Sequence, residues 1–367
     1  MRTVKRILTN TVAFGLAAGA AHAGGIERSH SPYAILWESG NYAELSFAYV
    51  KPKVSGTVGG GAVSSGDMAG DYSQIGLGVK YAINDQLDLA VVIDQPMGAD
   101  IAYSAPVGGL YPLAGSTGNI DSVAVTALAR YKFDGGFSVH GGIKAQRSNG
   151  DVSLPFVGAG YTMQTSKETD LGYIIGAAYE KPEIALRVAL TYQSSITHNF
   201  TSVETGLGGL SGTGSFETEV PQALTLDFQS GVAADTLVFG SIRWREWTAF
   251  DISPPGYGNP LAVGEALVEY NDDVVTYTLG VGRRFNENWA GAISIGYEGS
   301  GSSTVGNLGP HDGMRSITLG GTYTQDNMKI TAGVSYIDIG DAVTNTINGV
   351  FTDNSGVGFG MKVGYSF

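Results

Sequence analysis

The last twelve residues of the chain, 356–367, alternate strictly between two kinds of side chain. Even-numbered positions hold glycine, with one lysine and one serine. Odd-numbered positions hold the large apolar residues Val357, Phe359, Met361, Val363, Tyr365 and Phe367. Because successive side chains of a strand point to opposite faces, this pattern predicts a β-strand with one apolar face and one small or polar face. Such a strand fits either a membrane barrel or the core of a soluble sandwich.

The connections between the predicted strands alternate in length. Short turns rich in Asn, Asp and Gly occur at 84–85, 134–136, 181–183, 233–235, 286–288 and 326–327. Long glycine-rich connections lie near 56–70, 104–119, 149–163, 204–214, 250–271, 299–312 and 341–355. A sandwich has no reason to place all its long loops at one end, whereas outer-membrane barrels have short periplasmic turns and long external loops. The sequence therefore predicts an all-β fold, a transmembrane antiparallel β-barrel of about fourteen strands over residues 42–367.

Composition excludes several alternatives. No stretch after the N-terminus approaches the roughly 18–20 apolar residues that a membrane helix needs, so a membrane location requires a closed barrel. The formal net charge is −13 and no Lys/Arg cluster is present, which argues against a nucleic-acid partner. The chain has no cysteine and no His/Asp/Glu cluster with metal-ligand spacing, so we expect no disulfide, no metal and no other cofactor.

The N-terminus divides into two segments before the first predicted strand. Residues 1–23 have a basic head, an apolar stretch and the small-residue exit Ala21-His22-Ala23, the layout of a cleavable secretory signal. Residues 24–41 remain, and their apolar run contains Tyr33, Ile35, Leu36 and Trp37. We expect this segment to be a plug inside the barrel, with a periplasmic tail as the alternative. Export and the barrel pattern together predict a bacterial outer-membrane location.

The third predicted strand, 87–103, contains an interruption. The stretch is Asp94, Gln95, Pro96, Met97, Gly98, Ala99 and Asp100. Proline removes a backbone donor and glycine permits a bend, so we expect a kink or a gap in strand pairing here. Unpaired backbone at membrane depth must be covered by protein or water.

The layout resembles the FadL/TodX family of outer-membrane transporters for long-chain fatty acids and other hydrophobic compounds. The resemblance rests on about fourteen strands, an N-terminal segment before them, the interrupted third strand, and residues 41–56 as a first strand that exits into a loop. It implies that the kink at Asp94–Asp100 opens the barrel wall for lateral release of cargo into the membrane. The alternative is a bulge at the outer rim without a transport role. The plug lacks the Asn-Pro-Ala motif of the family, so its gating is expected to differ.

The long loops and the lumen suggest where a ligand binds. Apolar residues occur in loops that should be polar, namely Leu110, Tyr111, Leu113, Leu154, Phe156, Val157 and Leu261. We expect them to capture an apolar ligand, or alternatively to pack on one another as a lid. Alternation points Lys144, Arg187, Arg243 and Arg245 inward, where they are candidate partners of a fatty-acid carboxylate or of acidic lumen residues.

These features predict a passive uptake channel for a hydrophobic small molecule, with long-chain fatty acids as the first candidate. An aqueous porin and a structural barrel are the alternatives. The other expected partners are outer-membrane lipids, lipopolysaccharide and the barrel assembly machinery, to which Phe367 and its alternating strand present a familiar C-terminal signal. We expect a monomer. The histidines at 22, 30, 140, 198 and 311 are scattered along the sequence, so we expect no enzyme.

Overall fold

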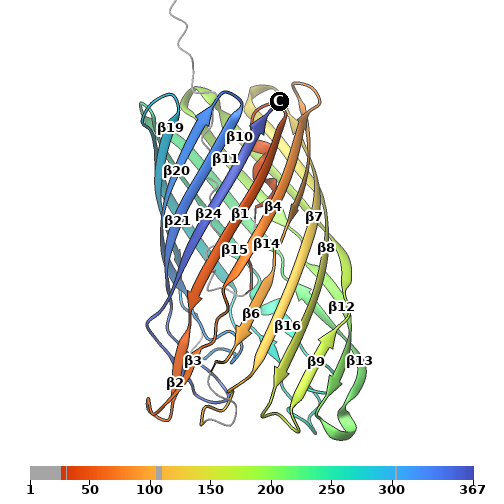
Figure 1. Cartoon of the computed structure of the whole chain (residues 1–367). Coiled ribbons are helices and arrows are strands. Elements are labelled where there is room, and N and C mark those ends of the chain that lie inside the picture. The colour runs from red at the N-terminus through yellow and green to blue at the C-terminus, as the bar shows by residue number, and fades with distance from the viewer. Residues whose placement is uncertain (1–25, 30, 105–109, 302–303) are drawn as a thin grey trace, which may run out of the picture.

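The computed structural model describes residues 26–29, 31–104, 110–301 and 304–367. The predicted signal segment, residues 24–25 and His30 lie outside the described residues. The main feature is a closed antiparallel barrel of fourteen strands (Figure 1). The wall comprises β1 (Tyr42–Lys53), β4 (Tyr72–Ala82), β5 (Leu87–Asp94) with β6 (Gly98–Ala102), β7 (Thr117–Lys132), β8 (Phe137–Leu154), β9 (Tyr161–Thr165) with β10 (Glu168–Lys181), β11 (Leu186–Gln193) with β12 (Ile196–Thr205), β13 (Gly212–Val220) with β14 (Ala223–Ala233), β15 (Thr236–Arg245), β18 (Val274–Arg284), β19 (Trp289–Glu298), β20 (Met314–Gln325), β21 (Met328–Ile339) and β24 (Asn354–Ser366).

The first and last strands close the barrel. Strand β1 pairs with β24 from Tyr42 opposite Ser366 to Lys53 opposite Ser355, and β1 pairs with β4 on its other edge. No strand edge of the wall is therefore left at the seam, which a barrel in lipid requires. The alternation predicted for the last strand is confirmed, because Val357, Phe359 and Met361 are exposed on the outer face whereas glycines lie between them.

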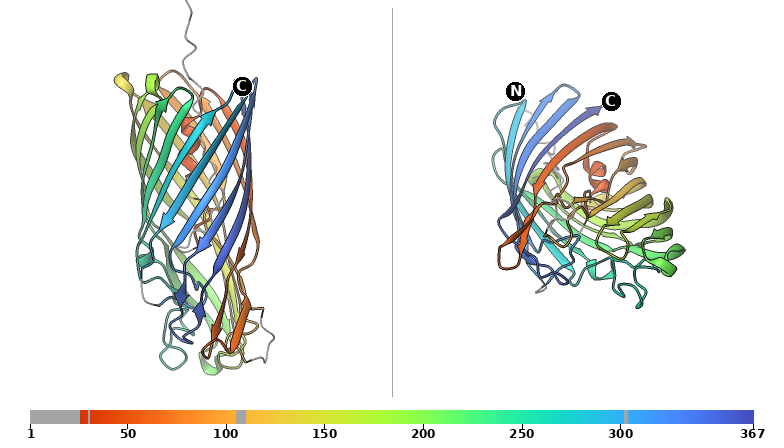
Figure 2. Two further views of the ribbon diagram at one scale, coloured as in Figure 1. Left: turned by 90° about the vertical axis from the view of Figure 1, so that its left-hand side faces the viewer. Right: turned by 60° about the horizontal axis from the view of Figure 1, so that its bottom comes forward.

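The two ends of the barrel differ, as the loop lengths predicted. Short turns lie at one end together with the C-terminus, and long loops with extra strands lie at the other (Figures 1 and 2). Aromatic rings from neighbouring strands pack near the short turns: Phe137 with Tyr179 and Trp289 with Tyr323, at centroid distances of 4.8 and 4.9 Å. Such rings are typical of a membrane-interface girdle. We assign the short-turn end to the periplasm.

The loop ends are more structured than the sequence predicted. The connection expected at 149–163 is largely strand, because β8 continues to Leu154 and β9 begins at Tyr161. Short strands also form among the long loops: β2 (Ser55–Val58), β3 (Val63–Asp67), β22 (Ala342–Val343) and β23 (Val350–Phe351) form one sheet, and β16 (Asp251–Ile252) pairs with β17 (Val268–Glu269). Glycine-rich composition indicated loops, but ladder hydrogen bonds and loop-to-loop packing override that local preference.

The N-terminal segment lies inside the barrel. Its 3₁₀ helix η1 (Pro32–Trp37) is the red coil within the wall in Figure 2, and it contacts β4, β5 and β7. Tyr33, Ile35 and Leu36 are buried against residues of the wall that include Ala90 and Leu128. Among the described helices, none is long and apolar enough to span a bilayer.

Four other single-turn 3₁₀ helices complete the described elements. They are η2 (Asp134–Gly136) and η3 (Pro182–Ile184) in short turns, and η4 (Gly208–Leu210) and η5 (Trp247–Ala249) at the loop end. In η2, Gly135 and Gly136 have φ of 83° and 89°, which favours glycine. Addition of a Cβ to Gly136 would also collide with the carbonyl oxygen of Glu180 in the adjacent turn.

Candidate functional site

The third strand is interrupted at Pro96. Strand β5 ends with Asp94 opposite Ala124 of β7, and β6 begins with Gly98 opposite Asp121. Between these two pairs, the third strand has three residues (95–97) where β7 has two (122–123). The third strand therefore contains a bulge of one residue. The Ser122 hydroxyl covers the irregular backbone, since its Oγ accepts from the Met97 N–H at 2.8 Å and donates to the Met97 carbonyl at 2.7 Å.

The same interruption leaves a gap in the ladder on the β4 side. Pairing of β4 with β5 ends at Leu77 opposite Ile93, and residues 72–76 of β4 have no strand partner on this edge among the described residues. The Gln95 side chain covers the gap, because its Oε1 accepts from the Ile75 N–H at 3.0 Å. The backbone carbonyl of Gln95 accepts a second hydrogen bond, from Gln74 Nε2 at 3.1 Å. The wall is therefore closed by side chains here, not by a continuous ladder.

The beginning of the N-terminal segment pairs with the interrupted strand. The Arg28 N–H donates to the Pro96 carbonyl at 2.8 Å, and the Gly98 N–H donates to the Ile26 carbonyl at 2.9 Å. These two bonds flank an isolated antiparallel bridge between Glu27 and Met97. Gly98 leaves room for the Arg28 guanidinium, which would have to move aside for a Cβ at this position. Burial lowers the pKa of that guanidinium, which stacks 4.2 Å above the Tyr72 ring.

Glu27 joins this pairing to the opposite wall. Its carboxylate accepts hydrogen bonds from Arg243, at 2.7 Å to Nη2 and 3.2 Å to Nε, and another from Arg245 Nη1. All three side chains are buried. We call Glu27, Arg243 and Arg245 the latch. A carboxylate gripped by two guanidinium groups is a strong charge-assisted contact, and loss of one partner would leave a buried charge uncompensated.

Two cavities lie on either side of this N-terminal stretch. The outer cavity has an empty volume of about 830 Å³, counting its opening to solvent, and the inner cavity about 2020 Å³. The outer cavity is lined largely by apolar side chains, among them Ile26, Met97, Ile101, Met163, Phe200, Phe216, Phe250 and Ile252. The inner cavity is lined by Arg28, Ser29, Asp94 and Gln95, and it reaches the ladder gap at residues 74–77. The two cavities share no lining residue, and residues 26–29 run from one to the other, because Ile26 lines the outer cavity whereas Arg28 and Ser29 line the inner one.

The predicted plug residues occupy two environments. Tyr33 and Trp37 line the inner cavity, whereas Ile35 and Leu36 are buried against the barrel wall. The Trp37 ring lies 4.3 Å from the Arg130 guanidinium carbon and 5.0 Å from that of Arg187.

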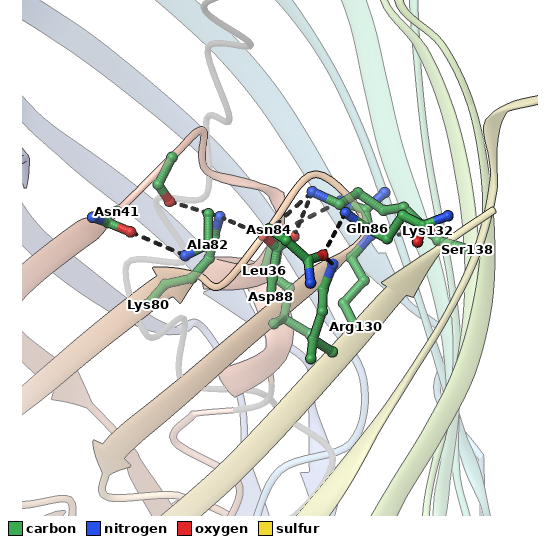
Figure 3. Close-up of polar contacts among 12 residues, drawn as sticks. Leu36, Asn41, Lys80, Ala82, Asn84, Gln86, Asp88, Arg130, Lys132 and Ser138 are labelled. Atoms are coloured by element: carbon green, nitrogen blue, oxygen red, sulfur yellow. Dashed lines mark hydrogen bonds and ion pairs between the residues drawn. The ribbon is translucent and has the colours of Figure 1, made fainter. Parts of the chain in front are cut away.

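Polar contacts hold the end of this segment in place (Figure 3). The Leu36 carbonyl accepts from Arg130, the Gly40 carbonyl accepts from Lys80 Nζ, and Asn41 Oδ1 accepts from the Ala82 N–H, at 3.3, 2.8 and 3.0 Å. Lys80 and Lys132 also form ion pairs with Asp88, at 3.5 and 3.1 Å.

The four predicted cations face the lumen but do not act as one site. Arg243 and Arg245 form ion pairs with Glu27, which corresponds to the alternative that these cations pair with acidic residues of the lumen. Lys144 is buried and interacts electrostatically with Asp94, although no hydrogen bond or ion pair joins it to another described residue. Arg187 lines the inner cavity beside Trp37. Sequence alternation predicted that these side chains face the lumen, but it could not predict their partners. Glu27, for example, lies more than 200 positions from Arg243 in the sequence.

The apolar loop residues divide between exposed and packed positions. Leu110 and Leu261 are 85% and 87% exposed, and Phe156 is half exposed. Tyr111 and Leu154 are instead buried in two loop clusters, against which Leu113 and Val157 respectively pack. Three of the seven residues are therefore exposed, as the predicted capture of a ligand requires, whereas the other four pack in loop clusters, as the alternative of a lid requires.

Sequence reasoning missed the polar group in the outer cavity. Ser148 on β8 and His198 on β12 line this cavity, and His198 also contacts Asp170 on β10. The scattered histidines gave no signal, but Ser148 shares its inward-facing parity with His140 and Lys144, which alternation had already pointed into the barrel. No group of three His, Asp or Glu side chains within the described ranges is arranged to hold a metal ion.

A closed fourteen-stranded barrel with an apolar outer face and a segment in its lumen defines a bacterial outer-membrane channel fold. The chain belongs to the outer membrane protein transport protein family (OMPP1/FadL/TodX), whose family model matches residues 30–367.

Solved structures support the fold. A FadL homologue of Pseudomonas aeruginosa is 15% identical with a TM-score of 0.74, and the match covers 92% of each chain. The toluene transporter TodX of Pseudomonas putida is 12% identical with a TM-score of 0.66, covering 95% of this chain and 96% of that one. The toluene transporter TbuX of Ralstonia pickettii is 15% identical with a TM-score of 0.63 and has the same coverage. A comparison with curated protein sequences gave no significant match.

Proposed function

We propose that this protein is a passive outer-membrane channel that moves hydrophobic molecules from the outer cavity to the inner one and releases them sideways through the third strand. The observation that carries the proposal is the position of residues 26–29, which run from the lining of the outer cavity to that of the inner one and pair with the interrupted strand. One movement of this stretch would connect the cavities and also remove the backbone partners of Pro96 and Gly98.

The outer cavity supports capture of an apolar cargo. Its lining includes the rings of Phe200, Phe216 and Phe250, and the exposed Leu110, Phe156 and Leu261 lie at the same loop end. Burial of apolar surface contributes roughly 25 cal/mol per Å², so a small hydrophobic molecule gains several kcal/mol on leaving water for such a cavity.

The ladder gap supports lateral release. Residues 72–76 of β4 lack a strand partner on the side of the interruption, and only the Gln95 side chain and nearby groups cover them. A rotamer change of one glutamine costs far less than breaking a ladder of backbone hydrogen bonds in lipid. Cargo in the inner cavity, which reaches these residues, would leave there without crossing a paired wall.

The cargo is a hydrophobic compound, and both long-chain fatty acids and aromatic hydrocarbons are candidates within the family. Arg187, which lines the inner cavity, and Lys144, which is buried and interacts with Asp94 of that lining, are the two predicted cations outside the latch, so we propose them for contact with a carboxylate. Catalysis is not part of the proposal. The rival function, a non-selective porin, would show steady ion conductance that does not respond to hydrophobic cargo.

A disulfide tests the proposed movement directly. Glu27 and Met97 face each other as a non-hydrogen-bonded antiparallel pair, a position with Cβ atoms close enough for a disulfide, and the wild-type chain has no cysteine. In the variant Glu27→Cys/Met97→Cys, we expect uptake of radiolabelled toluene and palmitate by cells to stop on oxidation and to return on reduction.

The reduced and oxidised forms of one polypeptide serve as each other's control, and each single-cysteine variant controls for oxidant effects. Equal uptake by both redox forms would refute movement of residues 26–29 as the gate. Uptake of neither compound by wild type, together with steady ion conductance, would support the porin.

A further inference from the structure

The outer cavity contains a buried polar cluster in a largely apolar lining. His198 Nδ1 lies 2.8 Å from Asp170 Oδ2, and His198 Nε2 lies 3.2 Å from the Ser148 hydroxyl. Thr218 sits directly opposite His198 in the β12–β13 ladder and lines the same cavity. Ser148, His198 and Thr218 are each at least nine-tenths buried.

The hydrogen bonds within this cluster have a defined direction. A carboxylate can only accept a hydrogen bond, so the protonated Nδ1 of His198 donates to Asp170. This hydrogen bond fixes the orientation of the imidazole ring. Nε2 of the neutral ring then accepts from the Ser148 hydroxyl, whose oxygen accepts in turn from Gln146 Nε2 at 3.3 Å. Asp170, His198 and Ser148 therefore have hydrogen-bond partners without a ligand.

Thr218 is the exception. Its hydroxyl is buried and has no hydrogen-bond partner among the described residues, although it borders the cavity. A buried hydroxyl without a partner is destabilising because it has lost its hydrogen bonds to water, so a bound molecule that supplies a partner recovers this energy. The free group therefore points to a ligand with a polar atom of its own.

Charge restricts what that polar atom is. Among the described residues that line the outer cavity, no Lys or Arg occurs, and Asp151 is the single acidic side chain. An ionised carboxylate buried here would meet no cation in the lining and would face a negative group, which is costly in an apolar surrounding. A hydroxyl or carbonyl group carries no such cost and hydrogen-bonds readily to a threonine hydroxyl.

We propose that the outer cavity selects neutral cargo with one hydroxyl or carbonyl group, which hydrogen-bonds to Thr218 while the apolar part packs against the paired rings of Phe200 and Phe216. The Ser148–His198–Asp170 chain provides a second, preoriented polar contact beside it. This inference rests on the proposed function, because it assigns the headgroup class of the same cargo.

The order Ser148, His198, Asp170 is also that of a nucleophile, a base and an orienting acid. Ser148 nevertheless lies within a strand, paired with Ser122 on one side and Glu168 on the other. Its backbone N–H groups and those of its neighbours are engaged in the ladders, so they do not form the pair of free donors that would stabilise an oxyanion. The cluster therefore has the geometry of a binding contact.

Three ring compounds of similar size separate the headgroup classes: 4-methylphenol, toluene and 4-methylbenzoate. We expect the purified wild-type protein at neutral pH to bind 4-methylphenol most tightly and 4-methylbenzoate most weakly, measured by calorimetry. Thr218→Val keeps the shape but removes the hydroxyl, and should weaken binding of 4-methylphenol by about tenfold while toluene binding is unchanged. Thr218→Ser should restore the preference, and Thr197→Val, at an exposed position of β12, is the matched control.

Three results would overturn the inference. They are an equal loss of toluene and 4-methylphenol binding in Thr218→Val, tighter binding of 4-methylbenzoate than of 4-methylphenol, and no binding of any compound by wild type. The redox test of the double-cysteine variant is independent of these measurements. Redox-controlled uptake combined with no headgroup preference would leave the channel function standing and would remove the Thr218 site alone.

Discussion

The two halves of the N-terminal segment are attached to the barrel in different ways. Residues 32–41 are held by the buried helix η1, by side-chain contacts to their carbonyl groups, and by the Lys329–Glu38 ion pair at 2.7 Å. Residues 26–29 contain one apolar side chain, that of Ile26, and are otherwise held by the latch and by backbone bonds to the interrupted strand. Hydrophobic contacts are lost only by moving the whole helix, whereas a charge contact can be exchanged for another. We therefore expect residues 26–29 to move while residues 32–41 stay attached to the barrel.

The largest expected effect comes from repairing the third strand. Deletion of Pro96 leaves three steps between Asp94 and Gly98, which matches the three steps between Ala124 and Asp121 on β7. A continuous ladder would then close the wall and remove the irregular backbone to which residues 26–29 attach. We expect cellular uptake of toluene to fall by about tenfold or more, because sideways exit would require breaking ladder bonds in lipid.

The matched control for this deletion is Pro96→Ala, which keeps the extra residue and should retain most of the uptake. Heat-modified electrophoretic mobility verifies that both variants form a barrel in the outer membrane. If the deletion variant folds and takes up toluene at the wild-type rate, the exit lies elsewhere.

The second effect comes from breaking the latch. It is smaller than that of the Pro96 deletion, and it opens the channel where the deletion closes it. Glu27→Gln leaves Arg243 and Arg245 buried without their carboxylate, and removal of one partner of a buried ion pair typically costs about 3–5 kcal/mol. A destabilisation of the closed position of residues 26–29 by only about 1.4 kcal/mol raises the ratio of open to closed channels about tenfold. We expect ion conductance of the reconstituted protein to rise several-fold.

Glu38→Gln is the matched control, because it removes a carboxylate from the anchored half of the segment, residues 32–41. It breaks the ion pair with Lys329 in the anchored half, and there we expect conductance close to that of wild type because hydrophobic contacts still hold η1. Equal conductance increases in both variants would show that the two halves move together, contrary to the comparison.

Sequence reasoning predicted the barrel well because its rules are local. Alternation with period two and short Asn/Asp/Gly turns determine strands and hairpins within about a dozen residues, and Pro96 with Gly98 predicted an irregular third strand. The contacts of the lumen are not local. Glu27 pairs with residues more than 200 positions away, and residues 26–29 have no periodic pattern that predicts their pairing with the third strand. Ser148 and His198 meet only because the register of the strands brings them together.

The smallest expected effect on transport comes from weakening the anchored half. Trp37 is buried between the guanidinium groups of Arg130 and Arg187 and lies edge-on to His140, with ring centroids 5.5 Å apart. Trp37→Ala removes these contacts, and loss of a buried tryptophan costs about 3–5 kcal/mol. That cost falls on docking of the segment, since the strands that form the barrel stay paired. We expect uptake of toluene to change by less than about twofold, because the latch still closes the passage between the cavities. Limited proteolysis from the periplasmic side should nevertheless cut the segment several-fold faster than in wild type. A loss of uptake as large as that of the Pro96 deletion would mean that the anchored half is itself the moving part.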